Sequence, residues 1–181
     1  MKMQPTVLHT IEEIKKLYPD VYVNEDGGSD TYQEGLPIVE RDPLTVVIKH
    51  PSQNSYLIAK WKKSEWNGFL TGGIEGEDSV EDTVRKEILE ETGYKHVSKI
   101  VPMDYVTHGV FFHPVKNVNR LAHYHLVFAE LTDLEKDDVS EEETNIADFV
   151  WIPYDDVLET LTREEMKLLW KHYSETLNPK L

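Results

Sequence analysis

LTGGIEGEDSVEDTVRKEILEETGY, residues 70–94 of the chain, combines a glycine-rich turn with a helix whose two ends are well marked. Asp78 or Ser79 can cap the first helical turn through its side-chain oxygen. Gly93, followed by an apolar residue, favours a left-handed stop at the other end. We therefore expect a helix over residues 80–92, directly behind a loop whose glycines let the backbone approach a ligand closely.

Three glutamates, Glu87, Glu90 and Glu91, recur at helical spacing in this segment. Like charges at such spacing repel by roughly 0.2–0.5 kcal/mol per pair, so stability alone does not favour them. At about 100° per residue, Glu91 falls within the apolar stripe of Val84 and Ile88, whereas a merely solvated acidic face would lie opposite it. The glutamates therefore border the interior and suit a divalent cation such as Mg²⁺, which prefers carboxylate and phosphate oxygens.

This segment resembles the signature of the Nudix hydrolases. That signature is a glycine, five residues, a glutamate, seven residues, an arginine and glutamate pair, an aliphatic residue, any residue, two glutamates, any residue, a glycine and an aliphatic residue. Residues 87–94, EILEETGY, reproduce its second half. The resemblance implies an α/β protein, with the Nudix-type α/β/α sandwich around a mixed β-sheet.

The first half of the signature is less regular, and two alignments are open. Counting back from the two glutamates puts Lys86 at the arginine, Asp78 at the first glutamate and Gly72 at the opening glycine. Alternatively, Glu77 and Arg85 keep the spacing of the first half, and one extra residue precedes the second half. Both alignments leave the three glutamates in place.

The resemblance implies a pyrophosphohydrolase that needs Mg²⁺ or Mn²⁺. In the family, the glutamates that match Glu87, Glu90 and Glu91 bind the metal, and one can help to activate water. A backbone carbonyl of the glycine turn, from Gly72 or its neighbour, commonly joins the metal ligands. Many members supply a further metal-binding acid from a later loop, where Glu143 or Glu142 could serve here, although such a charge run is usually only solvated.

The implied substrate is a small phosphorylated molecule, a nucleoside diphosphate derivative such as a nucleotide sugar, an ADP-ribose-like compound or a nucleoside triphosphate. The alternative is a Nudix-like metal- or nucleotide-binding or accessory domain with weak or no catalysis. Lys86 supports this alternative, because lysine lacks the planar fork with which arginine orients carboxylates. Residues 46–130 also resemble, more weakly, Nudix-like domains associated with some bacterial leucyl-tRNA synthetases.

Flanking patterns predict the other elements. Arg120 and His108 are candidate contacts for substrate phosphate, while His123 and His125 are interpreted as pocket lining or sheet face rather than a transition-metal pair. Trp61 is expected to pack in the core, together with the other aromatic residues before the glycine turn. Apolar and β-branched runs predict a hairpin of residues 44–50 and 56–60, further strands over residues 100–112 and 121–131, and helices over residues 154–161 and 163–176, the last behind the capping box Thr162 to Glu165.

The chain divides into an N-terminal extension, residues 1–42, and a Nudix domain, residues 43–181. In the extension, Thr10 and Glu13 form a capping box before a short helix, and residues 30–42 look like an irregular approach to the first core strand. We expect the extension to pack on the core, where it covers the sheet or contacts a second subunit in a homodimer.

Composition limits the remaining possibilities. The chain has 181 residues, of which 39% are hydrophobic, no cysteine and a net charge of −15. This charge argues against a nucleic-acid polymer as ligand, since such binding depends on basic surface. No stretch is long enough to cross a membrane and no secretory signal opens the sequence, so we expect a cytoplasmic protein.

Overall fold

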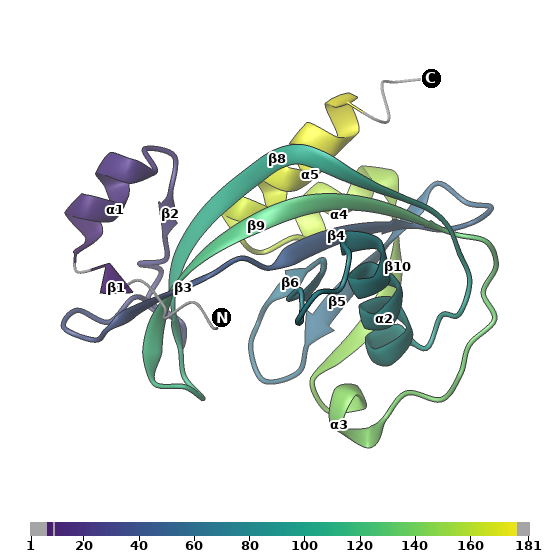
Figure 1. Cartoon of the computed structure of the whole chain (residues 1–181), viewed down its shortest axis with the longest axis horizontal. Coiled ribbons are helices and arrows are strands. Elements are labelled where there is room, and N and C mark those ends of the chain that lie inside the picture. Colours follow the sequence, from purple (N-terminus) through teal and green to yellow (C-terminus); the bar gives the residue numbers. More distant parts are fainter. Residues whose placement is uncertain (1–6, 9, 177–181) are drawn as a thin grey trace.

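The computed structural model of the chain describes residues 7–8 and 10–176. In this part of the chain a curled mixed sheet lies between helices (Figure 1). The helices are α1 (Ile11–Leu17), α2 (Val80–Thr92), α3 (Glu141–Thr144), α4 (Tyr154–Thr160) and α5 (Glu164–Thr176). The strands are β1 (Val7–Leu8), β2 (Tyr22–Val23), β3 (Ile38–Arg41), β4 (Leu44–Lys49), β5 (Ser55–Trp61), β6 (Asn67–Gly68), β7 (Leu70–Gly72), β8 (Val97–His113), β9 (Val118–Leu131) and β10 (Ala147–Pro153).

Strand β9 organises the sheet. It pairs in parallel with both β3 and β4 and antiparallel with β8, and the main strand order is β1-β3-β9-β4-β5-β10. On its other side, β4 pairs antiparallel with β5 and with β7, which brings Gly72 opposite Leu44. The expected mixed sheet and the expected strands are therefore confirmed, with β8 and β9 each starting three residues earlier than predicted.

The two faces of the sheet carry separate cores. Successive side chains of a strand point to opposite faces, and in β4 the fully buried Val46 and Ile48 pack with Ile88 of α2. Val47 points the other way and packs in the core beneath α4 and α5. Figure 1 shows α2 below the sheet and α4 and α5 above it, so the expected α/β/α sandwich is confirmed.

Helix α2 has the bounds that the sequence predicts, because its local signals act as expected. Ser79 caps it, its Oγ accepting the backbone N–H of Asp82 at 3.1 Å. Gly93 adopts the left-handed conformation with φ of 78°, which only glycine takes up without strain. Val84 and Ile88 are fully buried against the sheet. The apolar stripe therefore fixes the rotation of the helix, and with it the direction of the glutamates.

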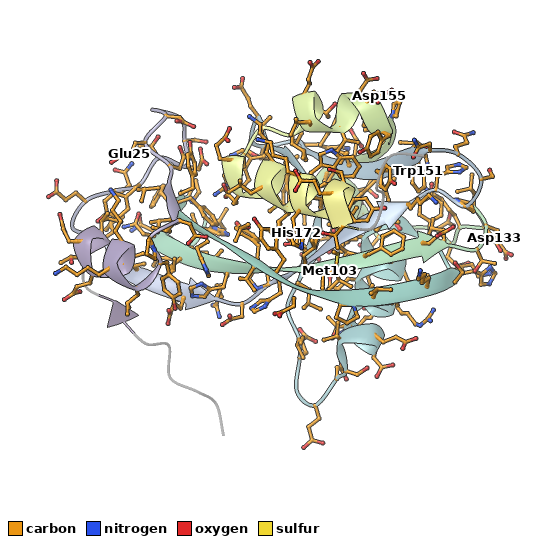
Figure 2. The ribbon with its side chains drawn as sticks, turned by 90° about the horizontal axis from the view of Figure 1, so that it is seen from above. Glu25, Met103, Asp133, Trp151, Asp155 and His172 are labelled. Carbon is orange, nitrogen blue, oxygen red and sulfur yellow. The ribbon has the colours of Figure 1, made fainter. Side chains whose placement is uncertain are left out.

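Helices α4 and α5 are also confirmed to within one residue at each predicted end, but the predicted capping box of α5 is wrong. Thr162 Oγ1 accepts the backbone N–H of Asn67 instead, at 3.0 Å. Glu165 turns inward, where its carboxylate is fully buried and accepts a hydrogen bond from Arg163 Nε at 2.6 Å. α5 lies over β8, and His172 stacks on Tyr105 with ring centroids 3.8 Å apart (Figure 2).

The described part of the N-terminal extension joins the sheet. Helix α1 forms with the expected reciprocal capping by Thr10 and Glu13. The irregular approach expected over residues 30–42 is only partly correct, because β3 forms there and pairs with β9, while β2 pairs in parallel with β8. Ile14 and Ile38 then close a small core at the end of the sheet away from α2 (Figure 1). The domain division at residue 42 and the second subunit stay predictions. Among the described residues, no helix combines the length and apolarity needed to span a bilayer.

Candidate active site

The glutamates of α2 face the glycine turn. The carboxyl group of Glu87 lies against the bare backbone of Gly72, where an added Cβ would come within 2.7 Å of Glu87 Oε1. Glu87 and Glu91 are half-buried and Glu90 is exposed. The carboxyl groups of Glu87 and Glu91 hydrogen-bond to each other, which requires a proton between them. The predicted cluster is thus a single site at the junction of β7 and α2.

The electrostatics of this site disfavour its own charges. Burial, followed by the neighbouring Glu87 and Glu143 carboxylates, raises the pKa of Glu91 to about 8. Burial and the charge of Glu90 raise the pKa of Glu87. A bound cation would reverse both effects, because an opposite charge favours the ionised carboxylate. The residues present therefore fit a divalent metal ion.

Of the two later acids considered, the structure brings Glu143 to the site. It lies on α3, which packs against α2, and Ser140 caps α3 by accepting the backbone N–H of Glu143 at 3.2 Å. The charge of Glu143 acts directly on Glu91. The loop before β10 therefore adds a fourth carboxylate beside α2.

The two alignments of the signature differ in where their basic residue lies. Arg85 turns away from the glutamates, pairing with Glu81 at 2.7 Å and donating to the carbonyl of Val97 at 2.8 Å. Lys86 pairs with Glu75 of the turn at 2.9 Å and is affected by the charge of Glu90. This arrangement favours the alignment with Lys86 in the place of the arginine.

A cavity of about 900 Å³ opens beside the site. The glycine turn, residues 71–74, forms one end, and aromatic side chains of Trp61, Trp66 and Phe111 form part of the walls. The expected core packing of Trp61 is wrong, since it is 36% exposed, because it stands at the end of β5 beyond the sheet's covered region. The cavity joins a metal-binding mouth to walls that can stack on a flat ring.

Arg120 lines this cavity, as does Arg41, which the sequence analysis missed. The order of Arg41 just before an apolar strand was its one signal. His108 lies elsewhere: its Nδ1 is 2.8 Å from Nδ1 of His123, and the ring of Tyr18 covers both. The structure therefore brings Arg120, but not His108, to the candidate substrate cavity. His125, like His123, lies outside the lining and contacts a carboxylate.

Comparison with known proteins agrees with this geometry. The family model described as the NUDIX domain matches residues 41–172. No curated protein sequence matches the chain. Among solved structures, the NUDIX domain of Shewanella oneidensis NrtR, complexed with ADP ribose, superposes with a TM-score of 0.56 at 16% identity, covering 77% of this chain and 89% of that chain.

Two further structures show the same fold. A NUDIX hydrolase from Listeria monocytogenes gives a TM-score of 0.54 at 15% identity over 76% of this chain and 94% of its own. The MutT protein of Bacillus halodurans gives 0.53 at 22% identity over 72% and 80%. Such low identities establish the fold alone, whereas the family model spans most of the chain and includes the glycine turn, α2 and the cavity. The chain belongs to the Nudix hydrolase family.

Proposed function

We propose that this protein is a Mg²⁺-dependent pyrophosphohydrolase that cleaves the diphosphate linkage of a nucleoside diphosphate derivative. One observation carries the proposal: Glu87 and Glu91 are pressed together at the mouth of a nucleotide-sized cavity, and among the described residues neither forms an ion pair with a basic side chain. Stability does not account for this arrangement, and a metal-bound diphosphate does.

In the proposed site, Glu87, Glu90 and Glu91 hold the metal, with Glu143 and the carbonyl of Gly72 as further ligands. When bound, Mg²⁺ neutralises charge on the phosphate oxygens. Glu91, whose pKa is raised by burial, is the side chain suited to accept a proton from the attacking water. The oxygen of water bonds to phosphorus, the bond to the bridging oxygen breaks, and that oxygen leaves with the second phosphate.

The size and lining of the cavity support the substrate class. A volume of about 900 Å³ falls in the range of small-molecule sites, and an aromatic wall is suited to a base. The NrtR domain in complex with ADP ribose and an Escherichia coli dihydroneopterin triphosphate pyrophosphohydrolase share the fold, at TM-scores of 0.56 and 0.53. Both printed ligands or substrates join a ring system to two or more phosphates, as the proposed substrate does.

The alternative is a domain that binds metal and nucleotide without turnover. The pairing of Lys86 with Glu75 favours it, because this lysine neutralises a residue of the turn rather than orienting a carboxylate of the cluster. The two functions share the metal site and differ only in catalysis, so one experiment can separate them.

The test is a screen for Mg²⁺-dependent cleavage of nucleoside triphosphates, nucleotide sugars, ADP-ribose, dinucleoside polyphosphates and coenzyme A. We expect turnover of at least one class, its loss in EDTA, and a decrease of about 10²–10⁴-fold in kcat when Glu90→Gln and Glu91→Gln are combined. Glu81→Gln, on the same helix but paired with Arg85, is the matched control and should retain activity.

Turnover that survives the double substitution or the removal of metal would contradict the proposed function. Titration with Mn²⁺ then identifies the alternative. A protein that binds Mn²⁺ through these glutamates but cleaves no substrate is the binding domain.

A further inference from the structure

Two of the four arginines in the chain lack a carboxylate partner, and these two lie together. Arg85 and Arg163 both pair with glutamates. Within residues 7–8 and 10–176, Arg41 and Arg120 form no ion pair, although the chain carries 34 acidic residues. Arg120 also holds its buried Nε without a hydrogen-bond acceptor. Since buried donors are almost always satisfied in folded proteins, this donor indicates a binding partner.

Three strands bring the basic side chains to one wall of the cavity. Arg120 and Ala122 are two residues apart on β9, so their side chains share the sheet face that lines it. β3 ends at Arg41, in register with Ala122. His113 of β8 lies nearby, and its Nδ1 accepts a backbone N–H, which leaves Nε2–H free to donate. We call Arg41, Arg120 and His113 the basic wall.

The basic wall is held together against its own repulsion. Burial and then the guanidinium of Arg41 lower the pKa of Arg120. Burial and then Arg120 likewise lower the pKa of His113. In a chain with a net charge of −15, placing these groups side by side without a carboxylate is costly unless an anion lies between them.

The basic wall is separate from the metal-binding mouth. Gly72 lies opposite Leu44, and Leu44 is in register with His125 of β9. Strands rise roughly 3.3 Å per residue, so Arg120 lies roughly 16 Å, and Arg41 roughly 10 Å, along the strands from that level. A diphosphate is shorter than either distance. The basic wall therefore faces the part of the substrate that extends away from the scissile diphosphate.

We propose that Arg41 and Arg120, with His113, bind a phosphate monoester on the distal part of the substrate, separate from the diphosphate that is cleaved. Two guanidinium groups and an imidazole N–H match a dianion with several acceptor oxygens better than a single carboxylate. The substrate class becomes a nucleoside diphosphate derivative with an additional phosphate. The position of the scissile end rests on the proposed function, whereas the phosphate subsite is testable without catalysis.

The test measures binding of three ligands that contain no diphosphate, so that cleavage plays no part. Adenosine 5′-monophosphate, adenosine 2′,5′-bisphosphate and adenosine 3′,5′-bisphosphate are titrated into the protein with Mg²⁺ by calorimetry. Tryptophan fluorescence is a second readout, because Trp61 and Trp66 line the cavity. We expect at least one bisphosphate to bind about tenfold or more tightly than the monophosphate, as for one added charge-assisted contact.

The variants assign that preference to the basic wall. Arg41→Gln combined with Arg120→Gln should reduce it to within about twofold. Arg41→Gln alone, at an exposed position, should weaken it at least about threefold and guards against misfolding of the double variant. Lys15→Gln removes one positive charge from exposed α1, outside the cavity, and should change nothing.

Equal affinities for the monophosphate and both bisphosphates, no binding of any of them, or a preference that survives both arginine substitutions would each overturn the proposed subsite. Failure of the proposed function looks different. In that case the bisphosphate preference remains and depends on the arginines, but no diphosphate compound is cleaved.

Discussion

The molecule contains two clusters of carboxylates that are at least partly buried, and they are neutralised in opposite ways. Asp30 and Glu165 flank Arg163, so the first cluster carries its own cation. Glu87 and Glu91 share a hydrogen bond and, in the described part of the chain, pair with no basic side chain. The first cluster needs nothing further and can be structural. The second is complete only when a cation comes from solution, which distinguishes a site from a scaffold.

The self-neutralised cluster connects distant parts of the chain. The guanidinium carbon of Arg163 lies 4.3 Å from the ring centroid of Phe111 and 4.8 Å from that of Trp66. Asp30 reaches it from the N-terminal extension at 3.8 Å. Gly109 leaves room for Glu165, since an added Cβ would lie 2.9 Å from Glu165 Oε1. One arginine thus joins the extension, β8 and the start of α5.

The largest effect is expected from removing that arginine. Arg163→Met leaves two buried carboxylates without their cation, which should cost about 3–5 kcal/mol of unfolding free energy. Lys167→Gln is the matched control, because Lys167 pairs with Glu164 at 2.8 Å on the surface of the same helix and should cost less than about 1 kcal/mol. Urea unfolding measures both. Equal costs would mean that the cluster around Arg163 does not stabilise the fold.

The second expected effect is a pH dependence of the metal-free protein. Glu91 has a pKa of about 8 in the fold against 4.5 as its ordinary value, so the folded state binds the extra proton. The resulting stability is present below about pH 4.5 and is lost as the pH rises through 8. We expect a decrease on the order of 3 kcal/mol across this window in EDTA, relative to Glu91→Gln.

Urea unfolding at a series of pH values, with and without Mg²⁺, checks this expectation. Added Mg²⁺ should restore most of the stability lost at high pH, because it pairs with the ionised form. Parallel pH profiles for the wild type and Glu91→Gln would show that the two clusters do not differ in the way described above.

The smallest effect is expected at the turn. Gly72→Ala should displace the Glu87 carboxyl group and weaken Mn²⁺ binding about 10- to 100-fold, comparable to the loss of a residue that orients a metal ligand. Gly73→Ala is the control, because an added Cβ there meets nothing within 4 Å. Calorimetric titration of both variants with Mn²⁺ tests the contrast, and matching affinities would remove Gly72 from the site.

Local signals explain why the sequence predicts some elements so closely. The cap at Ser79, the stop at Gly93 and the apolar stripe between them all act within one helix, so α2 and the direction of its glutamates follow from the sequence alone. The direction of a helix does not depend on distant residues once its apolar face is defined. The candidate metal cluster was therefore within reach of sequence analysis.

Features that depend on distant partners were not. β3 is stabilised by β9, about 80 residues later, and nothing in residues 30–42 specifies that pairing. Arg163 and Glu165 read as a polar helix start, and only the space beside Gly109 turns Glu165 inward. His108 reads as a phosphate contact, but its cover, Tyr18, comes from the extension. Partner identity, rather than residue type, decides these positions.

The central place of β9 has a consequence during protein synthesis. β3 and one edge of β4 have no partner until Val118–Leu131 has been made, 82 residues after the end of β4. At about 5–20 residues per second, this delay is roughly 4–16 s. The apolar run of β4 must stay free of wrong contacts for that time. Completion of the sheet is therefore a late, long-range step that limits how fast a newly made chain becomes active.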